Sequence, residues 1–438
     1  MAYATIDIFN MERLDFKTFI ATIPQVHYFN YLIKWLLLST VIGFCIGSVS
    51  AFFLTSLDFV TNFRESHIWI IALLPLGGLL IGLTYYYFGS NVVKGSNQLL
   101  EEFHSPKEII PFKMAPLVLF GTLITHLFGG SAGREGTAVQ IGGAIADQFT
   151  HLLKLKNRDR KIILIIGISA GFASVFGTPL AGAIFALEVM VLGRIRYDSI
   201  IPSFLAAVIA DYFCRIWGVS HTHYSIPFVP KMDPINLGWT VLIAILFGVT
   251  ALLFSKSTHF FTSQFANFIK YPPLRPFIGG VIIALIVWCF GATKYIGLGI
   301  PTIVESFTHD LPPYDFIIKL LLTAFTLGAG FKGGEVTPLF FIGATLGNAL
   351  FFFVPLPIAL LAGMGFVAVF SGATNTPIAC TLMGIELFGA ESGIYIGVAC
   401  VVAYLFSGHT GIYSSQIIGS PKHLLYGRLK SRNIGQTH

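Results

Sequence analysis

The sequence predicts an all-α integral membrane protein that contains an internal repeat, and three observations support this prediction. Of the 438 residues, 55% are hydrophobic and only 11% are charged, which is far more apolar than a soluble domain of ordinary composition. Two pairs of short motifs recur in the same order along the chain. Apolar stretches at or near the length that spans a bilayer cover residues 31–63, 68–88, 162–192, 239–254 and 277–288. We therefore expect many membrane helices rather than a single anchor.

Glycine and proline are frequent enough to predict tilted, broken helices. The chain contains 45 Gly and 21 Pro, which would be costly in a bundle of plain spanning helices. Re-entrant helices tolerate these residues, because the backbone groups freed at a break are buried in protein or line a cavity. We therefore expect discontinuous helices that begin or end inside the membrane.

The excess of positive charge is concentrated in short connecting segments. The 27 Lys and Arg residues exceed the 21 Asp and Glu residues by six. Because no extended basic face results, nucleic acid is not an expected partner. The positive-inside rule places the basic segments on the cytoplasmic side of the cell (inner) membrane, and simple anchoring at the lipid surface is compatible with them as well. The basic residues are Lys154, Lys156, Arg158, Arg160 and Lys161 in one segment and Arg428, Lys430 and Arg432 near the C-terminus.

The sequence does not favour an enzyme or a metal protein. It contains no HExxH motif and no cluster of His residues, so we expect neither catalytic activity nor a bound cofactor or metal ion. The cysteines occur singly in apolar surroundings, without CxxC spacing, and we expect them to contribute only to packing. They are Cys45, Cys214, Cys289, Cys380 and Cys400.

Two motif pairs define the internal repeat. GREGT at 133–137 falls on GGEVT at 333–337, an offset of 200 residues. Two such matches in register indicate related halves, which in transporters meet near the bilayer midplane and form the binding site from discontinuous helices. The second pair, at an offset of 198 residues, is TPLA at 178–181 with Glu188 and TPIA at 376–379 with Glu386.

Both repeated loops have the features of an anion site at the start of a helix. A helix that begins inside the membrane directs free N–H groups and the positive end of its dipole at whatever lies beyond it. Small residues precede an apolar helical run at 131–137 and at 330–338, where Pro338 suits a first helical turn. Glycine, such as Gly133, lets an ion approach the backbone. A lone Gly-rich stretch more often indicates close packing, but each of these loops also carries a glutamate.

The glutamates of the two loops, Glu135 and Glu335, point to function. A charged side chain in the hydrocarbon region costs about 2.5–3.5 kcal/mol on insertion scales, so it is usually functional or paired. Beside a helix N-terminus, an ionised Glu135 would occupy the anion site, whereas a protonated Glu135 would lose that attraction and swing away. One carboxyl group could thus link anion entry to proton uptake.

The motifs resemble those of the CLC family of chloride channels and antiporters. GREG at 133–136 is similar to the glutamate-gate motif of that family, and GGEVTP at 333–338 resembles its second-half GGxxxP motif. The segment 411–414 resembles the one that carries its central tyrosine, and the likeness extends from about Tyr31 to Gln416. The resemblance implies an inverted-topology repeat of tilted, broken helices, a homodimer with one pore per subunit, and cytoplasmic termini without a regulatory domain.

The resemblance also implies an order of domains and a set of site residues. Glu135 would be the external gate, Tyr413 would direct its hydroxyl at the central anion, and Ser96 would be the first-half partner of that anion. The expected anion-binding residues are Ser96, Gly133, Thr137, Thr337, Tyr413 and, through their backbone N–H groups, Phe340 and Ile342. The expected parts are a cytoplasmic N-terminal segment (1–30), a first membrane repeat (31–217), a second membrane repeat (218–416) and a cytoplasmic C-terminal tail (417–438).

Departures from the chloride-transporting members are similar to the fluoride/proton antiporter branch of the family. Thr137 follows GREG where those members usually have proline. The triplet EVT at 335–337 stands where those members usually have a triplet that contains an aromatic residue. Val189 stands where chloride/proton antiporters carry an inner proton-relay glutamate. We therefore expect Glu335, with Thr337 as its hydroxyl partner, to hold or carry the proton on the inner side.

The expected function is export of fluoride driven by inward movement of protons. Fluoride is small and strongly hydrated, so a selective site needs hydrogen-bond donors, such as hydroxyl groups, that replace its water. The alternatives are a chloride/proton antiporter, favoured by Ser96, and a passive voltage-gated-type chloride channel, favoured by Val189. The expected partners are fluoride or chloride, protons, the lipid bilayer and a second copy of the chain.

Four other polar residues have two interpretations each. Glu188 and Glu386 are interpreted as structural acceptors for backbone N–H groups freed by broken helices, with a functional role as the alternative. His126 could shuttle protons or form hydrogen bonds between helices. Arg134 could attract anions or orient the loop that carries Glu135.

Overall fold

The computed structural model describes residues 24–436, so most of the predicted N-terminal segment (1–30) lies outside the described residues. The helices of the first half are α2 (Pro24–Ser66), α3 (Leu74–Phe88), α4 (Ser96–His104), α5 (Met114–Leu127), α6 (Glu135–Leu152), α7 (Asn157–Phe176), α8 (Pro179–Glu188) and α9 (Ile200–Ile216). Those of the second half are α10 (Pro234–Phe268), α11 (Leu274–Phe290), α12 (Ile300–Glu305), α13 (Asp315–Gly328), α14 (Val336–Leu350), α15 (Ile358–Thr374), α16 (Pro377–Phe388) and α17 (Gly393–Phe406). The short elements are the 3₁₀ helices η1 (Ile68–Leu73), η2 (Ser90–Val92), η3 (Tyr197–Ser199), η4 (Ala292–Tyr295), η5 (Ala390–Ser392), η6 (Leu424–Leu429) and η7 (Ile434–Gln436) and the strands β1 (Val191–Leu192) and β2 (Ile417–Ile418).

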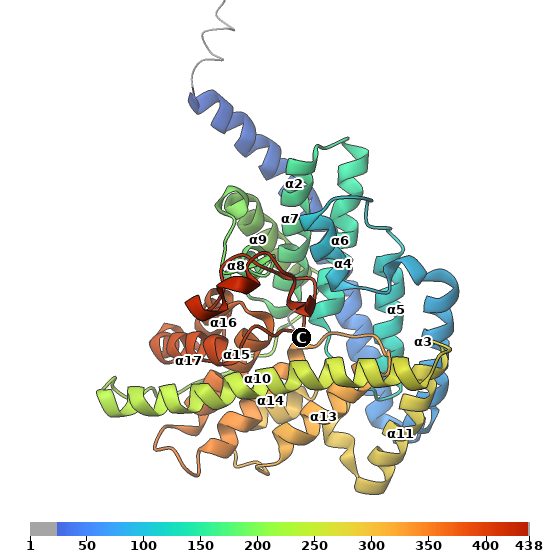
Figure 1. Ribbon diagram of the computed structural model, residues 1–438, viewed down its shortest axis with the longest axis vertical. Coiled ribbons are helices and arrows are strands. Elements are labelled where there is room, and N and C mark those ends of the chain that lie inside the picture. The colour runs from blue at the N-terminus through green and yellow to red at the C-terminus, as the bar shows by residue number, and fades with distance from the viewer. Residues whose placement is uncertain (1–23, 437–438) are drawn as a thin grey trace, which may run out of the picture.

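The two halves present their helices in the same order. Among the described residues, each half begins with a long helix, α2 or α10, continues through an apolar helix and a short helix, and then adds five more. In this order α6 corresponds to α14, and each starts at one of the repeated glutamate loops (Figure 1). The prediction of an all-α repeat of broken helices is confirmed. The predicted boundary at 217/218 falls between α9 and α10 and stays a prediction.

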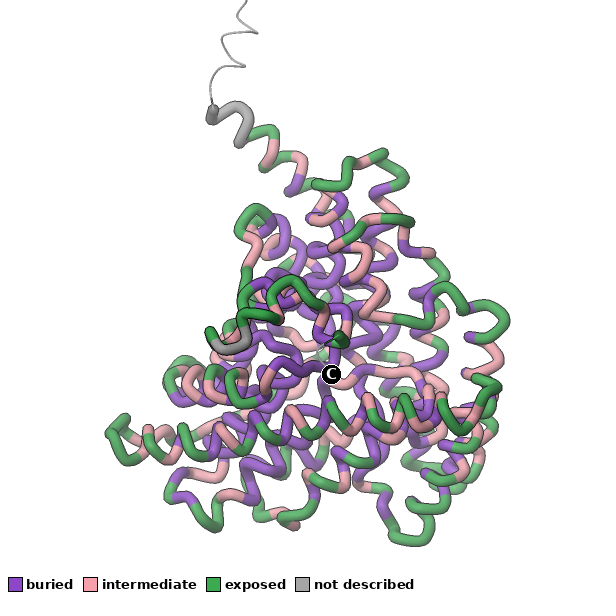
Figure 2. Tube along the Cα trace, in the orientation of Figure 1, coloured by how far each residue is buried: buried purple, intermediate pink, exposed green. Residues whose placement is uncertain are grey.

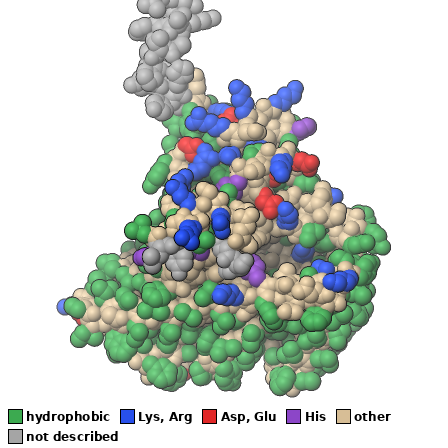
Figure 3. Space-filling model, in the orientation of Figure 1, with side chains coloured by type: hydrophobic (Ala, Val, Ile, Leu, Met, Phe, Trp, Pro, Cys, Tyr) green, Lys and Arg blue, Asp and Glu red, His purple; other side chains and the backbone are tan. Residues whose placement is uncertain are grey.

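The outer surface of the helices is apolar, as a membrane protein requires. Within residues 24–436, four helical segments are long and apolar enough to cross a membrane: Phe29–Ser66, Ile68–Phe88, Tyr197–Ile216 and Pro234–Phe268. Most of the other apolar helices are shorter, as expected of helices that end inside the bilayer. Buried residues occupy the centre of the molecule (Figure 2), whereas hydrophobic side chains cover the lower part of the surface in Figure 3. Such a surface would face lipid.

Two glutamates join α8 and α16 across the repeat. Glu188, the last residue of α8, accepts hydrogen bonds from the N–H groups of Ile378 (3.2 Å) and Ala379 (2.9 Å) at the start of α16. Glu386 of α16 accepts them from Leu180 (2.9 Å) and Ala181 (2.8 Å) at the start of α8. Two halves that are related by a two-fold axis make reciprocal contacts of this kind. The interpretation of both carboxylates as acceptors for freed backbone groups is confirmed.

Glycine allows equivalent helix pairs of the two halves to pack closely. A Cβ atom added at Gly142 of α6 would lie 2.2 Å from the carbonyl oxygen of Gly167 in α7. In the second half, a Cβ at Gly343 of α14 would lie 2.0 Å from the carbonyl oxygen of Gly365 in α15. Small residues of this kind let membrane helices approach backbone to backbone. The contact holds each re-entrant helix against the helix that follows it.

The C-terminal segment is folded against the membrane core. β2 pairs in parallel with β1, which follows α8. The N–H of Gly435 donates to the carbonyl of Ser414 at 2.9 Å, and that of Ile434 to the carbonyl of Gln416 at 3.0 Å. The side chain of Ile434 is fully buried, in a cluster with Leu192 and Ile418. Residues 417–436, predicted as a tail, thus contact the segment that carries Tyr413.

Helix α2 distinguishes the two ends of the molecule. Near its N-terminal end, Lys34 Nζ lies 2.6 Å from Asp159 Oδ2 in the basic segment 154–161. Arg64 follows 64 − 34 = 30 residues later, which is about 45 Å along an α-helix and exceeds the hydrocarbon thickness of about 30 Å. Arg64 therefore lies toward the opposite membrane face. We call the Lys34 end, where the basic segment 154–161 lies, the inner side.

Candidate functional site: an anion seat between two helix starts

The loops that precede α6 and α14 are paired with each other. The N–H of Gly133 donates to the carbonyl of Gly334 at 2.6 Å, and the N–H of Gly334 donates to the carbonyl of Gly133 at 2.7 Å. A Cβ atom at Gly133 would lie 3.0 Å from that Gly334 oxygen, and one at Gly334 would lie 2.7 Å from the nitrogen of Gly136. Glycine is therefore required for this close approach. The two motifs that the repeat relates by sequence form one site.

The carboxylate of Glu135 occupies the N-terminal end of α14. Its Oε2 accepts a hydrogen bond from the N–H of Thr337 at 3.1 Å, and its Oε1 accepts one from the Thr337 hydroxyl. The N–H of Arg134 donates to Oε2 at 3.1 Å. Glu135 is 1% exposed. We call these three donors, the N–H and hydroxyl of Thr337 and the N–H of Arg134, the anion seat, because unsatisfied donors at a helix start are what an anion needs.

Arg134 contributes charge as well as its N–H group. Its Nε lies 3.5 Å from Glu135 Oε1, which makes an ion pair. Nε is buried and, within residues 24–436, has no hydrogen-bond partner. The guanidinium therefore attracts the carboxylate without a directional bond to it. Of the two interpretations of Arg134, the geometry supports the one in which it orients the Glu135 loop.

A polar cavity of about 160 Å³ lies beside the seat. We call it the inner cavity, because it adjoins α4, whose Glu102 lies 3.1 Å from Arg160 of the basic segment. Two of the predicted anion-binding residues, Ser96 and Tyr413, line it together with Glu335. The residues that line the cavity are Val93, Lys94, Gly95, Ser96, Asn97, Val118, Gly136, Gln140, Phe331, Lys332, Gly333, Gly334, Glu335, Val336, Ile412 and Tyr413.

The side chain of Glu335 is available to the cavity. Glu335 is half-buried, and within the described part of the chain its carboxylate has no hydrogen bond or ion pair. Its backbone carbonyl accepts the N–H of Leu339, so the residue caps α14 through the main chain only. The structure thus brings Glu335, which directly follows Gly334 of the backbone pair, into the same cavity as Tyr413.

The Tyr413 segment is held to α4. Asn97 Oδ1 accepts the N–H of Ser415 at 3.0 Å, and Glu101 accepts the Ser415 hydroxyl at 3.0 Å. α4 itself begins after Gly95, whose φ of +56° is a conformation that glycine adopts readily. These contacts bring the segments that carry Ser96 and Tyr413 together at the inner cavity.

Thr137 is close to the site but its hydroxyl is committed elsewhere. Thr137 Oγ1 lies 2.7 Å from Thr122 Oγ1, and Thr122 donates its hydroxyl hydrogen to the carbonyl of Val118 at 2.7 Å. A hydroxyl has one hydrogen to donate, so Thr137 must be the donor in the Thr122–Thr137 bond. Its hydrogen is then not available to an anion, in contrast to that of Thr337.

Phe340 and Ile342 lie deeper in α14 than the seat. They are the fifth and seventh residues of the helix, beyond the first four N–H groups that lack an intrahelical acceptor. Neither is among the residues that line the inner cavity. The ring of Phe340 stacks on that of Phe366 at a centroid distance of 3.9 Å. The structure therefore does not bring these two residues together with Ser96 and Tyr413.

Sequence reasoning missed several groups of the site. Lys332 and Gln140 line the inner cavity, and Thr122 binds Thr137. The position of Lys332, three residues before Glu335 in an otherwise apolar loop, was a usable signal. Gln140 follows Thr137 by three residues, so the spacing of one helical turn also placed it near the site.

Two segments match the GxSxG pattern of serine hydrolases but lack its geometry. The hydroxyl of Ser131, in 129–133, donates to the carbonyl of Tyr295 at 2.9 Å. The hydroxyl of Ser169, in 167–171, donates to the carbonyl of Ser203 at 2.8 Å. Neither hydroxyl contacts a His within the described residues, so neither segment has the base that such a nucleophile needs.

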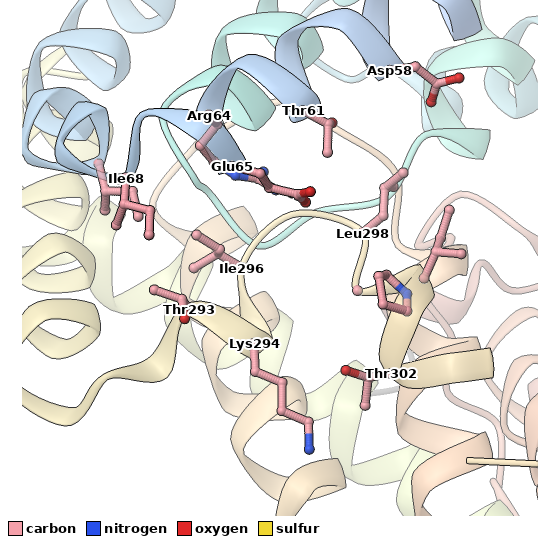
Figure 4. Close-up of a pocket in the computed structure, with 14 residues that line it drawn as sticks. Asp58, Thr61, Arg64, Glu65, Ile68, Thr293, Lys294, Ile296, Leu298 and Thr302 are labelled. Atoms are coloured by element: carbon pink, nitrogen blue, oxygen red, sulfur yellow. The ribbon is translucent and has the colours of Figure 1, made fainter. Parts of the chain in front are cut away.

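A second cavity, of about 360 Å³, lies at the Arg64 end of α2, and we call it the outer cavity. Figure 4 shows residues of α2 on one side of it and the segment 293–302 on the other. Arg64 Nη1 donates to the carbonyl of His126 at 2.9 Å, and His126 Nε2 lies 3.1 Å from the carbonyl of Ala132. Two hydrogen bonds thus connect this cavity to the loop before Glu135. His126 serves here as a link between a helix and a loop.

The fold and the site together define a class of protein. Residues 24–436 hold no group of three or more His, Cys, Asp or Glu side chains placed to bind a metal ion. Two repeated halves, re-entrant helix starts and a buried carboxylate in an anion seat beside a polar cavity are features of a membrane transporter for anions. The chain belongs to the Voltage gated chloride channel (CLC) family, whose family model matches residues 77–408. This family consists of ion channels and transporters.

Individual relatives extend along nearly the whole chain. A chloride/fluoride channel protein of Pseudomonas syringae pv. tomato is 52% identical over 405 residues, 91% of this chain and 90% of that protein. An H(+)/Cl(-) exchange transporter of Vibrio cholerae is 26% identical and covers 92% of this chain and 91% of its own. A crystal structure of a CLC-type fluoride/proton antiporter superposes with a TM-score of 0.86 at 35% identity, covering 88% of this chain and 98% of that one.

Proposed function

We propose that this chain exchanges fluoride for protons across a membrane, with Glu135 as the gate. The observation that carries the proposal is the anion seat, in which the hydroxyl and N–H of Thr337 bind a carboxylate where they could instead bind a halide. The relatives named for chloride/fluoride transport and for fluoride/proton exchange support the choice of ions.

The gate works by competition for the seat. An ionised Glu135 satisfies the three donors and excludes a halide. Protonation removes the negative charge of the carboxylate, so its attraction to the helix start falls and the side chain can leave. A halide from the inner cavity then takes the same donors. When Glu135 loses its proton again, the carboxylate displaces the halide from the seat. The proton and the halide are thereby exchanged across the membrane.

Glu335 provides the inner station of the proton. Val189, at the position where chloride/proton antiporters carry a relay glutamate, is an apolar residue that is 2% exposed. Glu335 lines the inner cavity without a competing partner among the described residues, so its carboxylate is free to accept a proton from water there. A proton on Glu335 has to cross only the space between the two paired loops to reach Glu135.

Selectivity for fluoride follows from the donors of the seat. Fluoride loses much of its hydration when it binds, so short hydrogen bonds from a hydroxyl and from backbone N–H groups favour it. Chloride is larger and depends less on such donors. Ser96 in the inner cavity favours the second candidate, a chloride/proton antiporter, because serine at this position is typical of chloride transporters.

The chain acts in the cell (inner) membrane as a homodimer with one pore in each subunit. The basic segment 154–161 and the C-terminal segment 417–436 face the cytoplasm in this arrangement, as the positive-inside rule requires. Fluoride then leaves the cell through the inner cavity, the seat and the outer cavity in that order, and protons enter in the opposite direction.

Release of ions from liposomes tests the proposal. Purified protein is reconstituted into vesicles loaded with either potassium fluoride or potassium chloride, and efflux is followed with ion-selective electrodes after valinomycin is added. We expect fluoride efflux to be at least about tenfold faster than chloride efflux. Equal or faster chloride efflux would support the chloride antiporter instead, and release of neither ion would reject both.

A further inference from the structure

Lys332 has an unusual position in the inner cavity. It lies three residues before Glu335, in the loop that leads to the anion seat, and it lines the cavity together with Glu335, Ser96 and Tyr413. The residue that the repeat relates to it is Ala132, which is fully buried, so only the second half carries this charge.

The charge of Lys332 is not neutralised by an acid. Within the described residues its ammonium has no ion pair and no hydrogen bond, and Nζ lies 4.2 Å from the centroid of the Tyr85 ring. The face of an aromatic ring attracts a cation without cancelling its charge. Lys94, which also lines the cavity, differs, because its Nζ lies 2.7 Å from Glu101 Oε2.

The side chain of Lys332 is fixed in place. A Cβ atom at Gly121 of α5 would lie 2.9 Å from both Cβ and Cγ of Lys332, so the lysine stem packs against that glycine. Tyr85 of α3 then holds the ammonium end. Lys332 also lines a third cavity, of about 370 Å³, which lies between α3 and α11 and which Tyr85 and Arg275 line as well. Lys332 thus stands where two cavities meet.

We propose that Lys332 recruits the transported anion to the inner cavity and offsets the negative charge of Glu335 there. This inference rests on the proposed function, because it assumes that a halide passes through this cavity. An ionised Glu335 repels an approaching halide, and a positive charge in the same cavity compensates that repulsion. The unpaired ammonium supplies this charge, whereas the paired Lys94 does not.

Substitution of Lys332 separates charge from shape. Lys332→Met keeps the length of the stem and removes the charge, Lys332→Arg keeps the charge, and Lys332→Gln is a second neutral variant. Lys107→Met is the matched control, since it removes an exposed lysine that lines neither of these cavities. Folding of each variant is checked by gel filtration and by thermal unfolding in detergent.

Fluoride and chloride binding to the purified variants is measured by isothermal titration at low and high concentrations of sodium gluconate. We expect Lys332→Met and Lys332→Gln to weaken halide binding by roughly five- to tenfold at low ionic strength, and less at high ionic strength, because salt screens the charge. Lys332→Arg and Lys107→Met should stay within about twofold of the unsubstituted protein. Adding Glu335→Gln to Lys332→Met should restore much of the affinity.

Two outcomes would overturn the inference. Unchanged halide binding by both neutral variants would show that the charge is not used, and equally weak binding by Lys332→Arg would show that shape matters instead. Either result leaves the proposed function standing as long as the unsubstituted protein releases fluoride from liposomes. Failure of that release would reject the proposed function itself, whatever the Lys332 series gives.

Discussion

The carboxylate of Glu135 in the first half of the chain is bound by the N–H and the hydroxyl of Thr337 in the second half. The two residues are 202 positions apart in sequence, and the Gly133–Gly334 backbone pair holds their loops together. A side-chain anion therefore occupies a helix start that belongs to the other repeat. Two of the three donors of the seat come from the half opposite the gate, so movement of one half relative to the other would alter both the gate and its seat.

Thr337 and Thr137 are predicted to differ in importance, although the repeat relates them. Thr337→Val removes a hydroxyl that donates to a charged acceptor, a bond worth about 1.5–3 kcal/mol, so we expect fluoride binding to weaken about tenfold or more. Thr137→Val removes a hydroxyl that donates to Thr122 and should change fluoride binding much less. Titration of both variants with fluoride checks this. Similar losses in the two variants would argue against the assigned donor directions.

Glu335→Gln should uncouple protons from anions. An amide keeps the size of the side chain in the inner cavity but cannot carry the proton, so we expect fluoride efflux to continue while proton uptake falls to near background. The measurement is simultaneous recording of external pH and fluoride over reconstituted vesicles. Glu391→Gln, at an exposed glutamate, is the control. Full coupling in Glu335→Gln would reject the inner proton station.

Glu188 should matter for stability rather than for ion selectivity. Glu188→Ala leaves the N–H groups of Ile378 and Ala379 without their acceptor. An unsatisfied buried donor costs about 1–3 kcal/mol, so for two donors we expect a loss of about 2–6 kcal/mol and a clearly lower thermal midpoint in detergent. Glu391→Ala, at an exposed position, should leave the midpoint unchanged. A stable Glu188→Ala variant with altered fluoride/chloride preference would contradict the structural role.

The C-terminal segment should affect transport because it supports the segment that carries Tyr413. Ile434→Ala removes a fully buried side chain beside β2, which costs about 2–5 kcal/mol in a well-packed core. Because Gly435 binds the carbonyl of Ser414, we also expect slower fluoride efflux. Arg428→Ala, at an exposed residue, is the matched control. Unchanged efflux in Ile434→Ala would show that this segment does not support the site.

Periodicity and repetition in the sequence were enough to predict the class of fold and the location of the site. The repeated glutamates identified both loops, and the spacing of Glu188 and Glu386 after TPxA identified two equivalent acceptors. Equivalence in sequence does not say which groups meet, however. That Glu188 caps α16 while Glu386 caps α8 depends on the two-fold arrangement of the halves, which no local pattern contains.

Hydrogen-bond direction and tertiary packing account for what the sequence could not predict. The repeat makes Thr137 and Thr337 equivalent in sequence. The hydroxyl of Thr137, however, is hydrogen-bonded to Thr122 from another helix. Apolar residues do not recur regularly in residues 417–436. The pairing of β2 with β1 could therefore not be predicted from the sequence. Lys332 carries a charge whose meaning depends on the absence of an ion pair to it among the described residues, and only the structure shows its surroundings.

The measurement that tests the account most directly is proton uptake during fluoride efflux by the unsubstituted protein and by Glu135→Gln. A pH electrode and a fluoride electrode record vesicles with an outward fluoride gradient. We predict that vesicles with the unsubstituted protein take up protons in a fixed ratio to the fluoride that they release. Glu135→Gln, which cannot ionise in the seat, should move fluoride without protons or not at all. Proton uptake at the full ratio in Glu135→Gln would show that the carboxylate is not the gate.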